Sequence, residues 1–252
     1  MNQSEKALYF KSLHKKHDPL VLYNIWDAGS AKALKDAGAK ANATGSWSVA
    51  AAQGYEDGEA IPLGFVVQIV ARISASVDLP LSVDFEGSYA VEPEKITKNV
   101  TKIINAGAIG INFEDRIVRE KGLHSINTQV ERIKAVRKAA ELANIPIFIN
   151  ARTDLFLGSN QNEHEAHVSK ALEREAAYVE AGADGFFVPG LSQLSLIERI
   201  VQGTSSPVNV MMKGELNSIT DIANIGVARA SFGPGPYFTA MSDLAKHYTA
   251  LR

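Results

Sequence analysis

Eight short apolar runs alternate along the chain with segments in which apolar residues recur every three to four positions. Each run ends on glycine or polar residues, which is typical of a buried strand followed by a turn. The stretches that contain the runs are 19–27, 36–46, 79–87, 105–115, 145–154, 180–190, 206–212 and 224–235. The helical period predicts helices over Ser30–Asp36, Pro62–Ser76, Glu92–Asn105, Gln129–Asn144, Glu163–Ala181, Leu194–Gln202, Ile219–Asn224 and Pro236–Leu251.

Strands that alternate with helices predict parallel strands joined by right-handed crossovers. Four of the stretches also share one internal pattern, in which a helix end, a glycine and a short strand follow one another. They are "DAGAKANATGS" (36–46), "NAGAIGINFED" (105–115), "EAGADGFFVPG" (180–190) and "NIGVARASFGPG" (224–235). Glycine suits this place because the residue after a helix often takes a left-handed conformation, which carries no penalty without a Cβ atom.

The length of the chain favours a closed barrel over an open, doubly wound sheet. A (β/α)8 barrel takes about 250 residues, and the chain has 252. No linker or low-complexity stretch separates one part of the chain from another. We therefore predict that residues 1–252 form a single (β/α)8 TIM-type barrel domain.

A barrel of this type carries its catalytic residues on the loops that follow the strands. The polar residues and turns after strands 1 to 8 are, in order, Asp27; Gly45-Ser46-Trp47 and Asp57; Asp84 and Glu86; Glu114 and Asp115; Arg152 and Asp154; Pro189-Gly190; Lys213 and Glu215; and "FGPGPY" (232–237). Acids therefore crowd the ends of strands 1 to 4. Several carboxylates at one mouth repel each other unless a cation neutralises them.

Three of these acids, Asp84, Glu86 and Glu114, form an all-oxygen set that suits Mg²⁺ or Mn²⁺ and not zinc. The alternative is that they are acidic turn residues that cap the following helices. Arg152 follows an apolar strand, where a guanidinium needs a partner. It either clamps a substrate carboxylate in a bidentate fork or forms a structural salt bridge with Asp154 or a neighbouring acid.

The "GSW" stretch also has two interpretations. The backbone N–H groups of Ser46 and Trp47 would bind a carboxylate or stabilise an oxyanion, whereas a plain tight turn would carry no chemistry. Sequence pattern alone leaves both open.

Composition narrows the classes of function. The formal net charge is −2 and the isoelectric point is near 6.3, which gives no electrostatic case for binding nucleic acid or an anionic membrane. No stretch reaches the roughly 18 consecutive apolar residues of a membrane span, and the N-terminus lacks the features of a signal peptide. The chain has no cysteine, so it has no disulfide, thiolate metal site or cysteine nucleophile. We expect a cytoplasmic protein.

The motifs together resemble the isocitrate lyase / phosphoenolpyruvate mutase superfamily. "GSW" (45–47), "GYED" (54–57), "VDFEGSY" (83–89), "INFED" (111–115), "ARTD" (151–154) and "EAGADGFFVPG" (180–190) occur in the order and spacing of that superfamily. The resemblance covers about residues 20 to 240. It implies a (β/α)8 barrel whose eighth helix is typically swapped between subunits of a dimer or tetramer. It also implies a site that holds Mg²⁺ and a 2-oxo acid or its enolate, and chemistry that makes or breaks C–C or P–C bonds.

The resemblance assigns a role to individual residues. Asp84 resembles the direct metal ligand, and Glu86 and Glu114 resemble acids that bind the metal directly or through water. Asp57 resembles the acid close to the metal and to the reactive carbon of the substrate. Arg152 resembles the guanidinium that grips the substrate, and Ser46 and Trp47 resemble the loop whose amides bind its carboxylate.

The loop after strand 4 departs from the lyases of the superfamily. Those enzymes carry a Lys-(Lys/Arg)-Cys-Gly-His run whose cysteine works as an acid/base, whereas this chain has "DRIVREKGLHSIN" (115–127). We expect a gate that closes over the substrate, with Gly122 absorbing the change in backbone. Lys121 or His124 would replace the cysteine as proton donor. The alternative is a solvated loop with no catalytic member.

Three hypotheses about function follow. The first is a Mg²⁺-dependent lyase, mutase or hydrolase that acts on a small 2-oxo acid, or on its 2-hydroxy dicarboxylate or phosphonate precursor, through an enolate. The second is a metal-dependent pyruvate aldolase, and the third is a catalytically reduced homologue that binds a dicarboxylate. The complete set of site residues argues against the third, and the spacing of the acids after strands 2 to 4 argues against the second.

The C-terminal segment predicts contact between subunits. In "YFTAMSDLAKHYTALR" (237–252), Phe238, Met241, Leu244 and Tyr248 form an apolar stripe at helical spacing. The stripe covers either its own barrel or a neighbouring subunit. By the resemblance we expect the neighbour, and therefore a homodimer or homotetramer.

Overall fold

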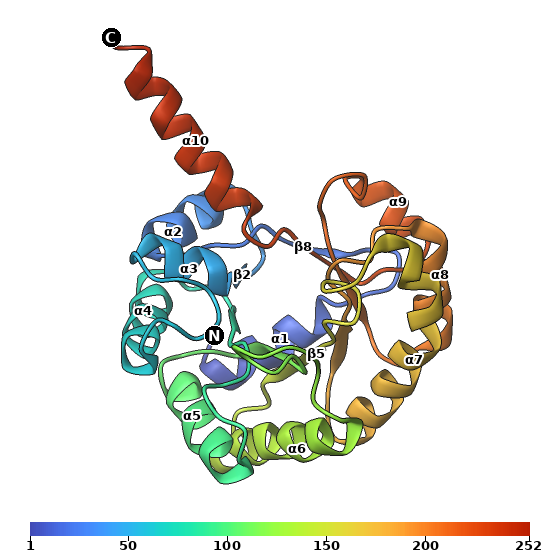
Figure 1. Cartoon of the computed structure of the whole chain (residues 1–252). Helices are drawn as coiled ribbons and strands as arrows, with labels where there is room; N and C mark the ends of the chain where they lie inside the picture. The colour runs from blue at the N-terminus through green and yellow to red at the C-terminus, as the bar shows by residue number, and fades with distance from the viewer.

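The computed structural model describes residues 1–252 and consists of eight parallel strands that curve into a barrel surrounded by helices (Figure 1). The strands are β1 (Leu20–Leu22), β2 (Asn42–Ala43), β3 (Leu81–Asp84), β4 (Gly110–Glu114), β5 (Phe148–Arg152), β6 (Gly185–Phe187), β7 (Val208–Met211) and β8 (Arg229–Ser231). Their hydrogen-bonded order is β1-β8-β7-β6-β5-β4-β3-β2. A single bridge between Ile25 and Thr44 joins the two end strands. The predicted (β/α)8 barrel is confirmed.

The helices agree closely with the pattern of apolar residues. They are α1 (Gln3–Ser12), α2 (Ala28–Asp36), α3 (Ser46–Ala52), α4 (Leu63–Ser76), α5 (Pro93–Asn105), α6 (Ile126–Ala143), α7 (His164–Glu180), α8 (Leu194–Gly203), α9 (Ile219–Asn224) and α10 (Gly235–Thr249). Only α3 falls where the sequence analysis placed a loop or turn. None of the helices is both long and apolar enough to cross a membrane.

The glycines of the repeated pattern adopt the expected backbone. Gly38, Gly107, Gly182 and Gly226 follow α2, α5, α7 and α9, and their φ angles are 92°, 105°, 107° and 86°. This left-handed conformation reverses the chain into the next strand without a steric cost at Cβ. Each of these turns sends the chain back toward the start of the barrel.

The N-terminal helix closes one end of the barrel. Phe10 of α1 is fully buried and packs edge-on against Phe148 at the start of β5, with ring centroids 5.7 Å apart. The two rings belong to a small apolar cluster that also includes Leu20 and Leu22 of β1. Because this cluster fills the end where the strands begin, a substrate can enter the barrel only from the end where the strands finish.

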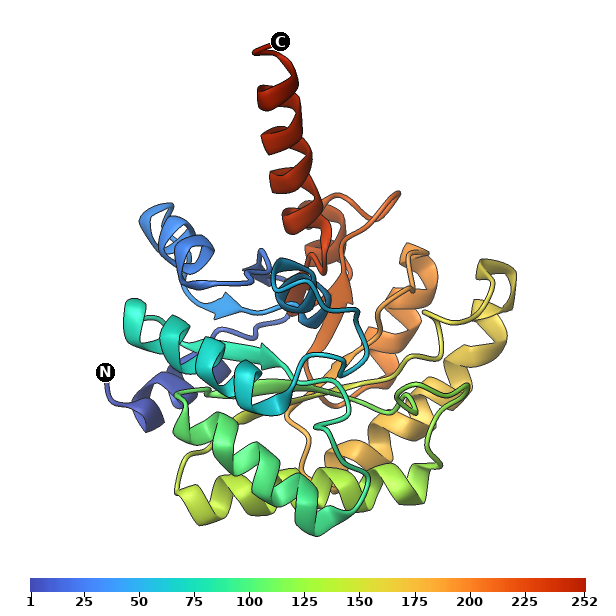
Figure 2. The same cartoon turned by 60° about the vertical axis from the view of Figure 1, so that its left-hand side comes forward.

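The last helix leaves the barrel. Figures 1 and 2 show α10 as a rod that projects away from the ring of helices. Pro236 is its only buried residue, whereas Leu244 is 65% exposed and Tyr248 is 57% exposed. At the foot of the helix Phe238 packs on Trp47 of the same barrel, whereas Leu244 and Tyr248 farther along the stripe stay exposed. Covering its own barrel therefore accounts for only the first part of the stripe.

Candidate active site

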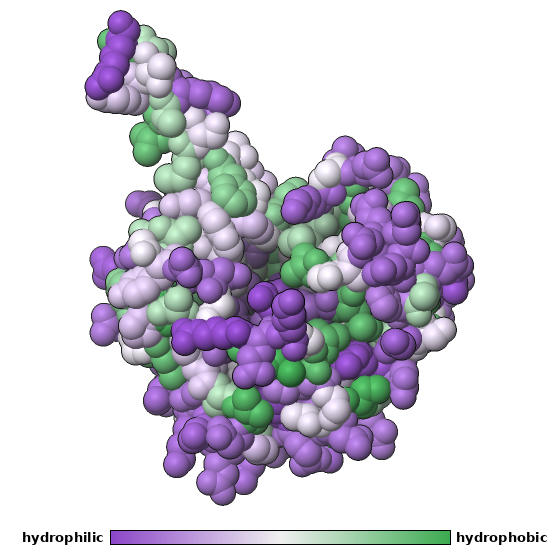
Figure 3. Space-filling model, viewed as in Figure 1, coloured by the Kyte–Doolittle hydropathy of each residue, from purple (hydrophilic) through white to green (hydrophobic).

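A cavity of about 390 Å³ lies at the end of the barrel where the strands finish. It is lined by residues that follow six of the strands, from Asn24 after β1 to Phe232 after β8, and by the first turn of α10. Figure 3 shows the surface hollowed beside the foot of this helix. Five of the nine predicted site residues line the cavity: Ser46, Trp47, Asp57, Asp84 and Arg152.

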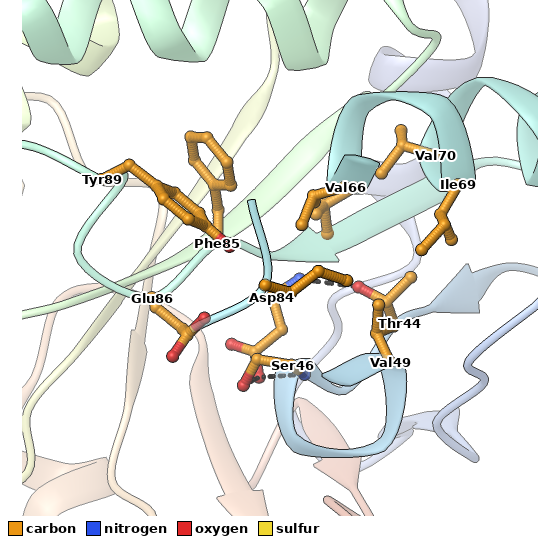
Figure 4. Close-up of a pocket in the computed structure, with 12 residues that line it drawn as sticks. Thr44, Ser46, Val49, Val66, Ile69, Val70, Asp84, Phe85, Glu86 and Tyr89 are labelled. Atoms are coloured by element: carbon orange, nitrogen blue, oxygen red, sulfur yellow. Dashed lines mark hydrogen bonds between the residues drawn. The ribbon is translucent and has the colours of Figure 1, made fainter. Parts of the chain in front are cut away.

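Asp84 is the last residue of β3 and is held from two sides. Its Oδ2 accepts hydrogen bonds from the backbone N–H (3.0 Å) and the hydroxyl (2.9 Å) of Ser46. The side-chain amide of Asn112 approaches Oδ1 at 3.3 Å. Figure 4 shows Asp84 directed toward Ser46 across the edge of a small apolar pocket of about 10 Å³. The carboxylate is therefore fixed in one orientation at the floor of the larger cavity.

Glu86 follows Asp84 on a turn and points to a second turn, residues 57–59. Its Oε1 accepts hydrogen bonds from the backbone N–H groups of Gly58 and Glu59, both at 3.0 Å. Glu86 is buried and has a left-handed φ of 50°, a conformation that costs energy in a residue with a Cβ atom. Burial, then the nearby charges of Asp57, Glu114 and Asp84, raise the pKa of Glu86 to about 9.

Glu114 ends β4 beside Arg152, which ends β5. Arg152 Nη1 lies 2.9 Å from Glu114 Oε2 and 3.9 Å from Asp84 Oδ1. The other edge of the guanidinium forms a bidentate pair with Asp154, through bonds of 2.6 Å and 2.9 Å. Burial raises the pKa of Glu114, and Arg152 opposes that rise. The structural salt bridge to Asp154 is thus present, and one guanidinium neutralises acids from three strands.

The three predicted metal ligands lie in one region but do not form a closed metal cluster. No group of three or more His, Cys, Asp or Glu side chains is arranged to enclose an ion. The reason is that each acid has a different protein partner, namely Ser46 for Asp84, the 57–59 turn for Glu86 and Arg152 for Glu114. A cage in which all three acids bind the ion directly is therefore not what the geometry shows.

The same acids still fit a hydrated Mg²⁺. Mg²⁺ usually keeps several of its waters and binds proteins through one or two carboxylates, so Asp84 would serve as the direct ligand and the other two would accept bonds from waters. Burial first, and then neighbouring acids, raise the pKa of Glu86 and of Glu114. A bound cation would stabilise the ionised form of these acids.

Asp57 lies at the rim of the cavity, where it is more exposed than the other acids. Partial burial and the charge of Asp84 raise its pKa, and bonds from Gly58 and Ser46 oppose the shift. An acid in this position can hold a proton near the substrate more easily than a fully solvated aspartate can.

Ser46 and Trp47 are the first two residues of helix α3. Of the two interpretations of this stretch, the plain tight turn is therefore wrong. Gly45 is the N-cap residue and has extended backbone, so the first N–H groups of the helix remain free of helical partners. The N–H of Ser46 is occupied by Asp84. The indole of Trp47 packs against Phe238 of α10, with ring centroids 4.5 Å apart, so the C-terminal helix helps to form the cavity wall.

The two predicted gate residues lie outside the main cavity. Helix α6 begins at Ile126, so the loop spans residues 115–125 and forms a hairpin in which Arg116 pairs with Leu123. Lys121 lines a neighbouring cavity of about 710 Å³, which shares Leu157 with the main one. His124 lines neither.

His124 is held by its backbone and is neutral at physiological pH. Its N–H donates to the carbonyl of Asp115 at 2.8 Å, and its carbonyl accepts two bonds from Arg174, both at 3.1 Å. Burial, then Arg132 and Arg174, lower the pKa of His124 to about 4. A neutral imidazole is a poor proton donor, and His124 lines neither cavity, so Lys121 is the better candidate of the two.

Three further residues of the site were not predicted. Asn112 on β4 contacts Asp84, Lys213 after β7 lines the cavity, and Arg119 in the gate hairpin bonds to the 57–59 turn. Lys213 follows a strand, so its place in the sequence carried the necessary signal. The positions of Asn112 and Arg119 in the sequence carried no such signal, because each residue acts through contacts with segments far away in the sequence.

Comparison with known proteins agrees with the fold and identifies the family. A family model described as phosphoenolpyruvate phosphomutase matches residues 10–252. An uncharacterised protein of Mycobacterium tuberculosis (strain H37Rv) is 33% identical over 228 residues, which is 90% of this chain and 83% of the relative. The 2-methylisocitrate lyase of Escherichia coli K12 is 28% identical and covers 96% of this chain, which in turn covers 83% of that enzyme.

One solved structure is similar over its whole length. It is a protein of Burkholderia cenocepacia J2315 described as a "putative phosphonomutase", with 43% identity, a TM-score of 0.97 and 100% of both chains covered. Together with the match over residues 10–252, this places the chain in the phosphoenolpyruvate phosphomutase family of the isocitrate lyase / phosphoenolpyruvate mutase superfamily.

Proposed function

We propose that this chain is a Mg²⁺- or Mn²⁺-dependent carbon–carbon lyase or phosphonomutase-like enzyme. Its substrate is a small 2-oxo acid, or a 2-hydroxy dicarboxylate or phosphonate that yields one. The observation that carries the proposal is the gathering of Asp84, Arg152 and the start of α3 on one closed-ended cavity, with Glu86 and Glu114 immediately behind. We place the enzyme in the cytoplasm.

The substrate would lie with its carboxylate and keto oxygens toward Asp84 and Arg152. Asp84 would hold the metal, with Glu86 and Glu114 orienting its waters, and the metal would supply a Lewis acid for negative charge on the substrate oxygens. Arg152 cannot rotate freely because Asp154 holds one edge of its guanidinium. That restraint leaves Nη1 as the edge of the guanidinium that faces Asp84.

The residues of the chain would then stabilise the negative charge that develops on the substrate and hold the proton that is transferred. When the C–C or P–C bond to the carbon next to the keto group breaks, the electron pair would stay on that carbon and give an enolate, whose charge would face Arg152. Asp57 stands at the rim, where it would hold or receive a proton beside the reactive carbon. The gate would exclude water while this charge exists.

Lys213 suggests that the substrate carries a second anionic group. The cavity is lined by two cations, Arg152 and Lys213. Arg152 is engaged by Glu114 and Asp154, whereas Lys213 forms no ion pair within the chain. Apolar side chains, including Met211 and Phe187, line the cavity as well. The second anionic group of a dicarboxylate or a phosphonate would form an ion pair with Lys213, whereas a monocarboxylate bound to Arg152 would leave Lys213 without one.

The proposal is tested by a panel of substrates assayed with Mg²⁺ for release of pyruvate or another 2-oxo acid. The panel contains 2-oxo acids, substituted malates, 2-methylisocitrate and phosphonopyruvate, together with pyruvate plus an aldehyde as the aldolase arm. We expect turnover of at least one dianionic compound and loss of turnover with EDTA. Turnover only in the aldolase arm, or turnover that EDTA leaves unchanged, would contradict the proposal.

The gate gives a separate prediction. Lys121→Ala should lower kcat by roughly 10²–10⁴-fold, because Lys121 would deliver the proton that no cysteine can deliver here. His124→Ala should change kcat little, because the imidazole is neutral above about pH 4. The kcat–pH profile of each variant is compared with that of Glu120→Ala, a neighbour in the same hairpin. If Lys121→Ala keeps the kcat and pH profile of the wild type, the gate is not the source of the proton.

We also propose that α10 packs on a neighbouring subunit, in a homodimer or homotetramer with swapped eighth helices. The helix leaves Leu244 and Tyr248 of its stripe bare. Val21 of β1 (44% exposed) and Tyr23 just after it (42%) are bare beside a groove of about 370 Å³. In a (β/α)8 barrel a ring of helices normally covers the strands. A partner's α10 would cover this side, and both apolar surfaces would be removed from water.

Light scattering at micromolar concentration tests this assembly. The wild type should have the mass of a dimer or tetramer, and the double variant Leu244→Glu/Tyr248→Glu should be monomeric, because two charges cannot be buried in an apolar contact. Leu142→Glu is the matched control, since Leu142 is also exposed (69%) but lies on α6. A monomeric wild type, or a double variant of unchanged mass, would count against the swap.

A further inference from the structure

The gate hairpin, residues 115–125, lies against the two turns that surround Glu86. The hairpin is closed by the Arg116–Leu123 bridge and by a bond from the N–H of Ile117 to the carbonyl of Gly122 at 3.1 Å. Its tip packs over Gly87 so closely that a Cβ atom there would lie 2.9 Å from Val118 Cγ2. The hairpin in this conformation is therefore docked, not free in solvent.

Arg119, at the tip of the hairpin, forms hydrogen bonds with the 57–59 turn. Its Nε donates to the carbonyl of Gly58 at 3.2 Å and its Nη2 donates to the carbonyl of Glu59 at 2.7 Å. One guanidinium thus binds two successive carbonyls in a fork, which a lysine ammonium cannot do in the same geometry. Arg119 itself has a left-handed φ of 65°, so the backbone at the tip is strained in the docked state.

The turn that Arg119 binds through its carbonyls holds Glu86 through its N–H groups, and the peptide group between Gly58 and Glu59 takes part in both contacts. The N–H groups of Gly58 and Glu59 both donate to Glu86 Oε1 at 3.0 Å. In return, Glu59 Oε1 accepts the backbone N–H of Tyr89 at 2.7 Å. The 57–59 turn and the 86–89 turn therefore exchange carboxylates, each capping the backbone of the other.

This exchange has a conformational cost. Glu59, Glu86, Ser88 and Tyr89 all have positive φ angles, between 50° and 65°. Four residues with Cβ atoms in this region persist only where surrounding contacts hold them. Asp57 begins the first of these turns, so whatever holds the turn also sets the position of Asp57 relative to Glu86.

We propose that Arg119 is a positioning residue that couples docking of the gate hairpin to the placement of Asp57 and Glu86. With the hairpin docked, its guanidinium holds the carbonyls of the 57–59 turn and keeps the amides of that turn aimed at Glu86. With the hairpin away, the turn loses this clamp, and the strained exchange with the 86–89 turn loosens. Closure of the gate and assembly of the acids are then one event. The part of this inference that concerns the metal rests on the proposed function.

Arg119→Ala and Arg119→Lys test the coupling in the metal-free protein, with Arg199→Ala as control. Arg199 is also an exposed arginine, but its partner is a carboxylate, Glu165 at 3.0 Å, and it lies on α8 away from the cavity. Hydrogen exchange of peptides that cover residues 54–61 and 83–90 should be about threefold to tenfold faster in both Arg119 variants than in the wild type or Arg199→Ala. Because Arg119 is exposed, the melting temperature should stay the same. Unchanged exchange in both peptides overturns the coupling.

Metal affinity tests the consequence for the site. Isothermal calorimetry with Mg²⁺ and with Mn²⁺ should show a loss of about threefold to tenfold in both Arg119 variants, and none in Arg199→Ala. Faster exchange with unchanged metal affinity would overturn the link from Arg119 to Glu86. If the wild type itself binds neither ion, the proposed metal-dependent function fails, and hydrogen exchange alone decides whether Arg119 clamps the turn.

Discussion

Asp84→Ala is expected to remove measurable Mg²⁺ binding and to lower kcat/KM by at least about 10³-fold. Asp84 is the only acid of the site that lies on the cavity floor and is not paired with Arg152 at short distance. Glu86 and Glu114 do not line the cavity, so neither reaches it as Asp84 does.

The measurement for Asp84→Ala is calorimetric titration with Mg²⁺, together with kinetics on whichever substrate the panel identifies. Asp78→Ala is the matched control, because Asp78 is an aspartate paired with Lys6 on the surface and far from the cavity lining. The fold should survive the Asp84 change, since the site residue bears a charge that the barrel core does not need. Metal affinity equal to that of the wild type would show that the ion binds elsewhere.

Arg152→Gln is expected to reduce both stability and activity. Removing one partner of a buried ion pair costs about 3–5 kcal/mol, because the remaining charges stay buried without compensation. Here three acids would lose their common partner: Asp84, Glu114 and Asp154. We also expect kcat/KM to fall by about 10²-fold or more, because the substrate loses the guanidinium that orients it.

Mg²⁺ distinguishes the role of Arg152 at the site from a general role in folding. In Arg152→Gln the ion should raise the melting temperature by more than in the wild type, because it would replace the missing positive charge. Arg137→Gln is the control: Arg137 also pairs with a carboxylate, at 2.5 Å from Asp184, but beside residues that precede β5 and β6, at the end of the barrel opposite the mouth. If Mg²⁺ stabilises both variants to the same extent as the wild type, Arg152 is not part of the metal region.

The elements of the barrel were predictable from sequence because their signals are local. The apolar period of a helix and the glycine after it are set by residues within a few positions of each other, and Gly107 and Gly182 fall where the pattern placed them. The short helix α3 was missed because its local signal is weak. Its apolar stripe is only seven residues long, too short to be distinguished from a turn.

The convergence of several predicted residues on one cavity was also predictable, because a parallel barrel brings every strand end to one mouth. Asp57, Asp84 and Arg152 line one cavity although they lie far apart in the chain. The partner of each residue was not predictable. Whether Arg152 would face a substrate or Asp154 depends on the rotation of one side chain, and the structure pairs it with Asp154, Glu114 and, at longer range, Asp84.

The sequence by itself thus determined the eight-unit barrel, the end at which the candidate site lies and the kinds of side chain that gather there, since periodicity and strand ends are properties of neighbouring residues. Only the tertiary structure decided that the acids have separate partners, that Arg119 reaches the 57–59 turn and that α10 turns away from its own barrel. These features depend on contacts between segments far apart in the chain, whose free energies come from distances and burial that no local pattern encodes.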